Sequence, residues 1–318
     1  MSPVRVFRCG LSADILSIPI PYSIEDLLPE DFYSRCESRR VSFYTGRLLL
    51  AAVLSAYYGV NSLKAADFLI SEHGKPFFSE SFYLRTGITK RIYFNLSHSG
   101  NCLCLSISDE DTATDIERRR QRKSMNDLAL KYFSDDEKAI MAEDGDGGVK
   151  SFFSFWTIRE TLVKYSGRGL SDITGFKFAL NRDRKLQDDV LSRLSIHGIS
   201  KDSVTGGWER SECDGSVDDN VISRAKVLDI MPTGEKNLYP KGSLIVTFDC
   251  VWRQDKGDAA EEYAMSVFIE AGSGVGCLEL HDVIMPEEAG SDVMFLPDSQ
   301  GIRLSLISRI ISSPDTGH

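Results

Sequence analysis

The sequence predicts an α+β fold made of two related lobes. The chain has 318 residues, which suggests one large or two moderate domains. Apolar residues make up 42% and charged residues 26% of it, as in soluble globular proteins. Both halves combine helical patterns with alternating strand patterns that look antiparallel. The expected division is an N-terminal lobe at 1–110, a C-terminal lobe at 111–285 and a C-terminal tail at 286–318.

The first half contains one long helical pattern and several short strands. The segment from Val41 to Tyr58 is rich in leucine and alanine, and Gly59 ends it. Its apolar residues lie on more than one face, so we expect a buried helix. Strands are expected at 4–7, 92–96 and 102–108, with turns at 73–76 and 97–100.

The second half begins with a strand pattern that leads into a basic loop. Ser134 and Glu137 have the spacing of a capping box, which predicts a helix start. A strong helix is expected from Ser151 to Ser166, ended by Gly167. We expect strands at 112–117, 176–180, 244–253 and 263–271, the basic loop at 118–123, helices at 124–132 and 135–143, and a polar insertion at 200–222.

The composition narrows the class of protein. The net charge of −10 argues against nonspecific binding to nucleic acid. The longest apolar run, Leu48 to Leu54, is too short to span a bilayer, and the N-terminus lacks the pattern of a signal peptide. The seven cysteines are scattered without a framework spacing, which fits a reducing cytoplasm. We therefore expect a cytoplasmic protein that binds neither membrane nor nucleic acid.

Asp115 and Glu117 are the first candidates for chemistry. Residues two apart on a strand point to the same side, so these carboxylates are expected to lie next to each other. Such a pair favours a cation, and magnesium commonly takes one or two carboxylates together with substrate phosphates. Taken alone, an Asp-x-Glu sequence is more often solvated surface.

The helix from Ser151 carries a second set of candidates. Trp156, Glu160 and Lys164 follow one another at intervals of four residues and therefore share a face. In isolation, Glu160 and Lys164 would be read as an ordinary surface ion pair that contributes about 0.3–0.5 kcal/mol.

The basic and hydroxyl side chains of the first half are candidates for binding an anion. Ser97 and His98 follow a strand and precede Gly100, where backbone amides and side-chain donors can meet a phosphate. Lys75 lies in the turn at 73–76. Arg47 interrupts an apolar helix, which is costly unless its charge reaches solvent or an anion. The commoner interpretations are a plain hairpin turn and solvated basic residues.

Each signal is weak alone, but their order and spacing are specific. The series consists of Arg39 to Arg47, Gly74-Lys75-Pro76, Phe94-Asn95-Leu96-Ser97-His98-Ser99-Gly100, Asp115-Ile116-Glu117, Tyr132-Phe133-Ser134 through Glu137, Phe155-Trp156-Thr157-Ile158-Arg159-Glu160, Lys164 and Gly167-Arg168-Gly169-Leu170.

This series closely resembles the surfactin-synthetase-type 4′-phosphopantetheinyl transferases over roughly residues 39–180. The resemblance implies two similar lobes related by a pseudo-two-fold axis, with the active site between them. It implies transfer of the phosphopantetheine arm of coenzyme A to a serine of an apo acyl or peptidyl carrier protein. Two lobes in one chain would allow a complete site in a monomer. The sequence departs from the family pattern at Ala113 and Thr114, and at Arg159, where lysine is usual.

The resemblance also implies a role for each candidate. Asp115, Glu117 and Glu160 would hold Mg²⁺ on the pyrophosphate of coenzyme A, and Glu160 would serve as general base. Lys164 would contact the phosphate under attack. The nucleotide end would be bound by Arg39, Arg47, Lys75, Ser97 and His98.

Two rival functions stay open at this point, together with one question about the partner. The chain could be a non-catalytic coenzyme A-binding or carrier-binding protein of the same fold, or a magnesium-dependent phosphohydrolase of another fold. The basic residues Arg119, Arg120 and Arg122 directly follow the metal strand, so we expect them to help dock an acidic carrier. A solvated loop is an equally good interpretation of such a charge run.

Overall fold

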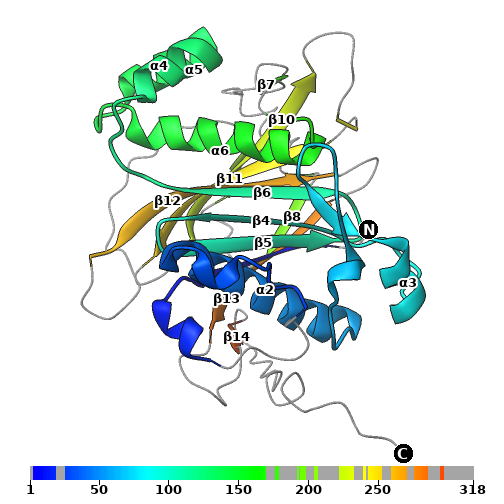
Figure 1. Cartoon of the computed structure of the whole chain (residues 1–318). Coiled ribbons are helices and arrows are strands. Elements are labelled where there is room, and N and C mark those ends of the chain that lie inside the picture. Colours follow the sequence, from blue (N-terminus) through cyan, green and yellow to red (C-terminus); the bar gives the residue numbers. More distant parts are fainter. Residues whose placement is uncertain are drawn as a thin grey trace, which may run out of the picture.

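Two stacked β-sheets lie between two layers of helix (Figure 1). This computed structural model describes residues 3–18, 26–169, 176–178, 192, 194–197, 204–206, 222–232, 239–240, 243–252, 259–270, 276–285 and 294–296. In each half a long helix covers one sheet, so the α+β prediction is confirmed.

The first sheet has the strand order β14-β13-β1-β5-β4, and β8 pairs with β13. Helix α2, Glu37–Tyr58, packs on its outer face, and Gly59 ends the helix with φ 70°, as its position in the sequence predicts. The leucines of α2 are buried against Phe7, Leu103 and Leu105 of the sheet. The strands are β1 Val4–Gly10, β4 Tyr93–Ser99, β5 Cys102–Ser108, β8 Leu194–His197, β13 Gly276–Ile284 and β14 Met294–Leu296.

The second sheet has the strand order β6-β12-β11-β10-β7, and β9 pairs with β10. Helix α6, Val149–Ser166, packs on its outer face through Phe152, Phe155, Ile158 and Leu162. The predicted pairing of the strands near 244 and 263 is confirmed as the antiparallel pair β11–β12. The strands are β6 Thr112–Arg118, β7 Phe176–Phe178, β9 Val204–Gly206, β10 Ile222–Pro232, β11 Leu244–Trp252 and β12 Glu261–Ile269.

The inner faces of the two sheets form a shared apolar core. Cys102 and Cys104 of β5 are buried there, as their alternation predicts, and they pack with Phe248 and Met265 of the second sheet. A core of this kind fixes the two sheets against each other, so residues on facing edges keep a constant spacing.

The remaining elements are short and flank these layers. Helices α4 and α5 follow β6, and Ser134 and Glu137 make the predicted capping box at the start of α5. No helix in the described part of the chain is both long and apolar enough to cross a bilayer. These elements are η1 Ala13–Ser17, η2 Phe32–Ser34, η3 Ala65–Asp67, β2 Phe68–Ile70, β3 Pro76–Phe78, α3 Glu80–Thr86, α4 Met125–Tyr132 and α5 Asp135–Glu143.

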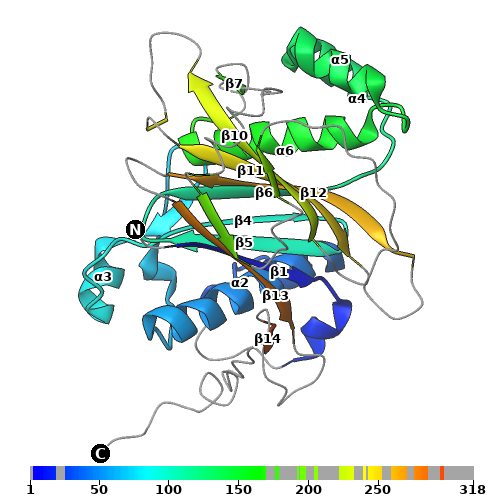
Figure 2. The same cartoon turned by 180° about the vertical axis from the view of Figure 1, so that it is seen from behind.

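Two features differ from the sequence-based expectation. The segment 97–99, expected as a turn, continues strand β4, and the chain reverses at Gly100 and Asn101 instead. Strand β13 pairs in parallel with β1 in the first sheet, although the division by sequence assigned it to the second lobe (Figure 2). Most of the expected insertion at 200–222, and most of the tail at 286–318, lie outside the described residues.

Candidate active site

The two sheets meet along β4 and β6, where side chains replace backbone pairing. Thr114, Ile116 and Arg118 of β6 donate their backbone N–H groups to side-chain oxygens of β4, at 3.3, 3.4 and 3.0 Å. We call this contact the β4–β6 seam. The side chains that accept are Asn95, Ser97 and Ser99.

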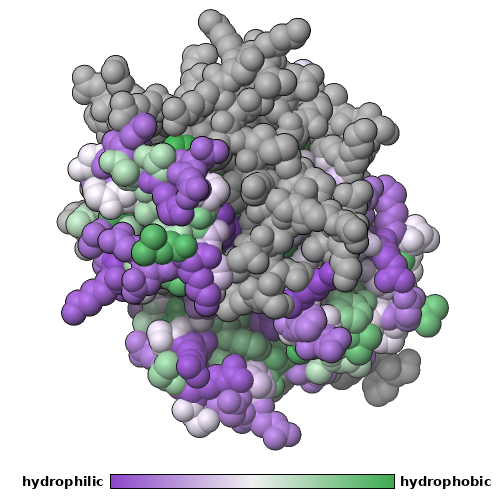
Figure 3. Space-filling model, turned by 90° about the horizontal axis from the view of Figure 1, so that it is seen from above, coloured by the Kyte–Doolittle hydropathy of each residue, from purple (hydrophilic) through white to green (hydrophobic). Residues whose placement is uncertain are grey.

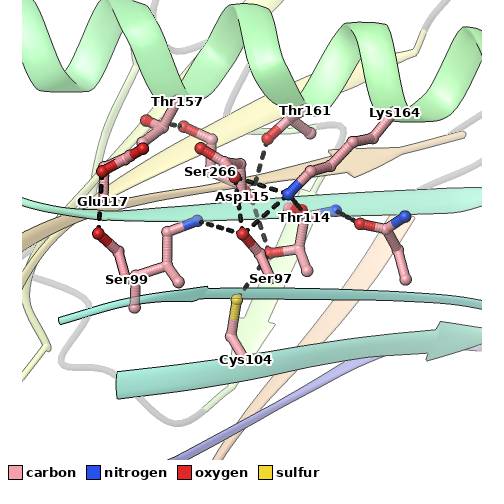
Figure 4. Close-up of polar contacts among 12 residues, drawn as sticks. Ser97, Ser99, Cys104, Thr114, Asp115, Glu117, Thr157, Thr161, Lys164 and Ser266 are labelled. Carbon is pink, nitrogen blue, oxygen red and sulfur yellow. Dashed lines mark hydrogen bonds and ion pairs between the residues drawn. The ribbon is translucent and has the colours of Figure 1, made fainter. Parts of the chain in front are cut away.

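The spacing of these acceptors has a simple cause. Residues two apart on a strand point to the same side, so Asn95, Ser97 and Ser99 form a row that faces β6. Asp115 and Glu117 of β6 lie beside this row, on the side of the seam that Lys164 reaches from α6 (Figure 4). The small polar residues in alternation along β4 were the sequence signal for this arrangement.

Lys164 reaches from α6 into the seam. Its ammonium group donates to Asp115 Oδ1 at 2.7 Å and to Ser97 Oγ at 2.8 Å, and Ser97 donates to the same oxygen of Asp115 at 2.7 Å (Figure 4). Burial of Lys164 alone would lower its pKa, but the charge of Asp115 and the hydrogen bond to it raise the pKa above its usual value. Lys164 is therefore a half-buried side chain that keeps its positive charge.

Glu117 is engaged from two directions. Ser99 donates to Glu117 Oε2 at 2.9 Å, and Arg122 donates to the same oxygen at 2.9 Å. The guanidinium of Arg122 also lies over the ring of Phe153, 4.9 Å from its centroid. The contacts of Ser99 and Arg122 with Glu117 had not been predicted, because they depend on how β4 and the loop after β6 lie around the strand.

Glu160, on the turn of α6 before Lys164, completes the group. Burial and the negative charges of Asp115 and Glu117 raise its pKa to about 7, although Lys164 acts in the opposite direction. The three predicted metal carboxylates are therefore close enough to influence one another. A carboxyl group with a pKa near neutrality can accept and release a proton under working conditions.

These residues fit a divalent cation, although they do not form a finished site. No group of three or more His, Cys, Asp or Glu side chains in the described residues is already arranged to hold a metal ion. Asp115 Oδ2, however, is buried without a hydrogen-bond partner among those residues. A buried carboxylate oxygen without a donor is costly unless a cation meets it. The donor set, all carboxylate oxygen, suits magnesium.

The other predicted residues lie around this centre at different distances. His98 is exposed on β4; partial burial and the charge of Lys164 lower its pKa, against the effect of Asp115. Lys75 donates to Asp111 Oδ1 at 3.0 Å and to the backbone oxygen of Tyr165 at 3.2 Å, so it contacts the end of α6.

The two arginines predicted to bind the nucleotide end lie on α2. Arg39 is exposed in the first turn of the helix. The guanidinium of Arg47 is 4.6 Å from the ring centroid of Phe43, and burial lowers its pKa. Among the described residues, neither side chain has a hydrogen bond or ion pair with Ser97, Asp115 or Lys164.

Hydroxyl groups fix α6 to the sheet beneath it. Thr157 and Ser266 of β12 share a hydrogen bond of 2.8 Å, and Thr161 donates to the backbone oxygen of Ser266 at 3.3 Å. Thr114 of β6 donates to that same oxygen at 2.9 Å. Because Thr157 and Thr161 lie three residues before Glu160 and Lys164, respectively, along the helix, these bonds hold the face that carries Glu160 and Lys164 close to Asp115.

Arg159, where lysine had been expected, has a structural role. Its guanidinium donates to both carboxylate oxygens of Glu137 at 2.7 Å and lies 4.4 Å from the ring centroid of Phe133. Glu137 is also part of the capping box of α5, so one buried carboxylate joins α5 to α6. The spacing of the two motifs in the sequence therefore reflects a direct contact. Planar bidentate geometry suits arginine better than lysine.

The predicted basic docking loop is only partly available to a partner. Arg119 is buried and ion-paired with Asp249 of β11, and Ser154 accepts a further hydrogen bond from it. Arg122 is bound to Glu117. Arg120 and Lys123 are exposed. The expectation that Arg119 contacts a carrier was wrong, because its guanidinium is buried and ion-paired with Asp249.

Comparison with known proteins identifies the group to which this site belongs. Residues 112–204 match the family model of the 4′-phosphopantetheinyl transferase superfamily. The 4′-phosphopantetheinyl transferase AcpT of Salmonella typhi is 37% identical over 160 residues, which cover 50% of this chain and 75% of the relative. AcpT of Escherichia coli strain K12 is 31% identical over 189 residues, covering 59% and 86%.

A relative of the surfactin-synthetase type is also similar, though at lower identity. The 4′-phosphopantetheinyl transferase Sfp of Bacillus subtilis strain 168 is 24% identical over 184 residues, which cover 57% of this chain and 76% of the relative. The matched residues 112–204 begin at β6 and include Asp115, Glu117, Glu160 and Lys164. The chain belongs to the 4′-phosphopantetheinyl transferase superfamily.

Proposed function

We propose that the chain transfers the 4′-phosphopantetheine arm of coenzyme A to a serine of an apo acyl or peptidyl carrier protein. The observation that carries this proposal is the grouping at one seam of a half-buried ammonium group, Lys164, with three carboxylates that influence one another's charge. Phosphoryl transfer needs positioning and stabilisation of negative charge more than covalent chemistry, and this grouping supplies both.

The reaction is a displacement at phosphorus. Glu160 accepts the proton of the carrier serine, whose oxygen then attacks the phosphorus that bears the pantetheine arm. The bond from that phosphorus to the bridging oxygen breaks, and adenosine 3′,5′-bisphosphate leaves with the electron pair. Lys164 neutralises charge on the transferring phosphoryl oxygens. Without a bound cation, burial and the neighbouring carboxylates raise the pKa of Glu160 to about 7, which supports its choice as the proton acceptor of this centre.

A divalent cation would be held by Asp115, Glu117 and Glu160. When bound, Mg²⁺ would neutralise the pyrophosphate and polarise the phosphorus–oxygen bonds. The buried Oδ2 of Asp115 supports its share in this site, as does the joint effect of Asp115 and Glu117 on the pKa of Glu160.

The nucleotide end of coenzyme A would lie along the first lobe. His98 is exposed near the end of β4, and Lys75 contacts the C-terminal end of α6, whereas the hydroxyl of Ser97 is already bound to Asp115 and Lys164. Arg47 is half-buried, and burial lowers the pKa of its guanidinium. A bound phosphate would therefore stabilise its charged form. Arg39 is exposed on the same helix, where it can reach an anion from solvent.

The carrier would meet the surface beside the basic loop. Arg120 and Lys123 are exposed there, and Leu130 of α4 has 71% of its side chain exposed nearby in the chain. The described surface on the side of α4, α5 and α6 is mostly hydrophilic with small hydrophobic patches (Figure 3). The two exposed cations suit a partner with acidic residues, and the exposed leucine of the following helix suits apolar contact. A cytoplasmic location and a monomeric state would fit this activity.

One experiment separates the proposal from its rivals. The protein is incubated with coenzyme A, Mg²⁺ and an apo carrier, and the carrier is then weighed by mass spectrometry. A gain of one phosphopantetheine arm supports the transferase. Release of free phosphate with an unchanged carrier would support a phosphohydrolase, and binding without any mass change would support a non-catalytic coenzyme A-binding or carrier-binding protein.

A further inference from the structure

Ser99 of the β4–β6 seam contacts both the backbone of β6 and the candidate metal ligand Glu117. Its hydroxyl lies between two partners, the backbone N–H of Arg118 at 3.0 Å and Glu117 Oε2 at 2.9 Å. An amide N–H can only donate, so the hydroxyl must accept from it. The single hydroxyl proton is therefore directed to Glu117. The two contacts together leave this side chain one orientation.

The other members of the seam show what is particular to Ser99. Ser97 repeats the pattern at Asp115, but its hydroxyl also accepts from Lys164 and so belongs to the charged centre. Asn95 accepts the N–H of Thr114 in the same way but contacts no carboxylate of β6 in the described residues. Asn95 therefore supports the strand, whereas Ser99 supports the strand and a predicted metal ligand at once.

The second partner of Glu117, Arg122, differs from Ser99 in its charge and in the element that carries it. Arg122 is a cation on the loop after β6, and 31% of its side chain is exposed. A divalent cation at Glu117 would repel this guanidinium and compete with it for the same carboxylate. The hydroxyl of Ser99 carries no net charge and sits on a strand paired with β5. It can therefore hold Glu117 without competing with the metal.

From these contacts we propose that Ser99 is a positioning residue that orients Glu117 for the divalent cation of the transfer reaction. The proposal rests on the proposed function, since it assumes that Glu117 is a ligand. With Oε2 held by Ser99, the position of the second oxygen, Oε1, is defined by the planar carboxylate. A ligand held in place before the metal arrives loses less conformational freedom on binding.

The test compares Ser99→Ala with Ser99→Thr and Asn95→Ala. Magnesium is titrated into each protein by calorimetry in the presence of coenzyme A and without carrier. A hydrogen bond to a charged group contributes about 1.5–3 kcal/mol, so Ser99→Ala should weaken magnesium affinity roughly tenfold or more. Ser99→Thr keeps the hydroxyl on a residue favoured in strands and should stay within about threefold of wild type.

Asn95→Ala is the matched control for damage to the seam. It removes an acceptor for a β6 amide, as Ser99→Ala does, and should lower the midpoint of thermal unfolding to a similar degree. Its magnesium affinity should equal that of wild type. Equal losses of magnesium affinity in Asn95→Ala and Ser99→Ala, or unchanged affinity in Ser99→Ala, would overturn the proposal.

The same proteins separate this inference from the proposed function. A wild-type protein that binds magnesium with coenzyme A but modifies no apo carrier would refute the transferase and leave the binding result on Ser99 intact. A wild-type protein that transfers the arm, beside a Ser99→Ala variant with unaltered magnesium dependence of turnover, would refute the role of Ser99 alone.

Discussion

Glu160 shows how the environment of a single residue prepares it for chemistry. Its carboxyl group is half-buried on the face of α6 that also carries Lys164. Burial and two neighbouring carboxylates raise its pKa to about 7, so near neutrality its proton is weakly held. The proposed cation and the proposed base reaction both depend on this side chain, and a substitution can distinguish them.

Glu160→Gln should separate binding from chemistry. Glutamine keeps the shape and one oxygen ligand but is not a useful base. We expect magnesium–coenzyme A affinity within roughly tenfold of wild type, about 1.4 kcal/mol. Turnover should fall by about two to four orders of magnitude. Calorimetry beside single-turnover transfer measures both quantities. Normal turnover would show that another group takes the proton, and a rate loss matched by lost affinity would show that Glu160 acts mainly as a ligand.

The raised pKa of Glu160 also predicts the pH dependence of stability in metal-free protein. Between about pH 4.5 and pH 7 the folded state keeps a proton that the unfolded chain releases, so stability falls as the pH rises through this window. Urea unfolding at several pH values should show this loss in wild type and a smaller one in Glu160→Gln. Parallel stability curves for the two proteins would contradict the assignment.

At this scale the sequence predicted the placement of the candidate ligands better than their hydrogen-bond partners. Asp115 and Glu117 lie on one side of β6, as their spacing requires, and Lys164 follows Glu160 by one turn. The contacts of Ser99 and Arg122 with Glu117 could not be predicted, since they arise from two strands that meet through side chains. The alternating small polar residues of β4 indicate a polar face, but they do not indicate which strand that face meets.

The loop after β6 differs most from its sequence-based interpretation as a docking loop. Its arginines looked alike in sequence, yet each has a different partner. Arg119 is buried against Asp249, Arg122 binds Glu117, and Arg120 and Lys123 face solvent. A long-range ion pair to β11 cannot be read from a run of basic residues, because both partners must first be brought together by the second sheet.

This arrangement predicts different effects for different charge reversals in the loop. The double variant Arg120→Glu/Lys123→Glu should raise the KM for an acidic carrier several-fold at low salt and leave coenzyme A affinity unchanged. Arg119→Glu should instead destabilise the fold by about 3 kcal/mol or more, since it places a second carboxylate beside a buried one. Carrier kinetics and urea unfolding measure the two effects. Unchanged carrier kinetics in the double variant would remove the docking role.

The helices were the elements most fully predicted. The pattern for α2 was correct at its C-terminus, where Gly59 adopts the left-handed conformation, and the helix begins at Glu37, four residues before the expected Val41. Helix α6 begins two residues before its expected start at Ser151. The strands were predicted less completely, because Ser97 and Ser99 are small polar residues that suggest a turn, although here both accept hydrogen bonds from the neighbouring sheet.

The whole molecule stacks two helix-covered sheets, and the candidate site lies where their edges meet. The sequence predicted two related lobes from the mixture of helices and strands in each half. It could not predict that β13 returns to pair with β1, because parallel pairing between distant segments leaves no local pattern. That return passes the chain from the second sheet back to the first and so helps to hold the seam together.

The most direct test of the account weighs one apo carrier after incubation with coenzyme A, Mg²⁺ and either wild-type protein or Asp115→Ala. Asp115 contacts Ser97 and Lys164, and its buried Oδ2 is the proposed ligand of the cation. Loss of this side chain should therefore abolish transfer. We predict that wild type adds one phosphopantetheine arm to the carrier serine and that Asp115→Ala adds none. Full modification by Asp115→Ala at limiting magnesium, or an unmodified carrier with wild type across a panel of carriers, would contradict the account.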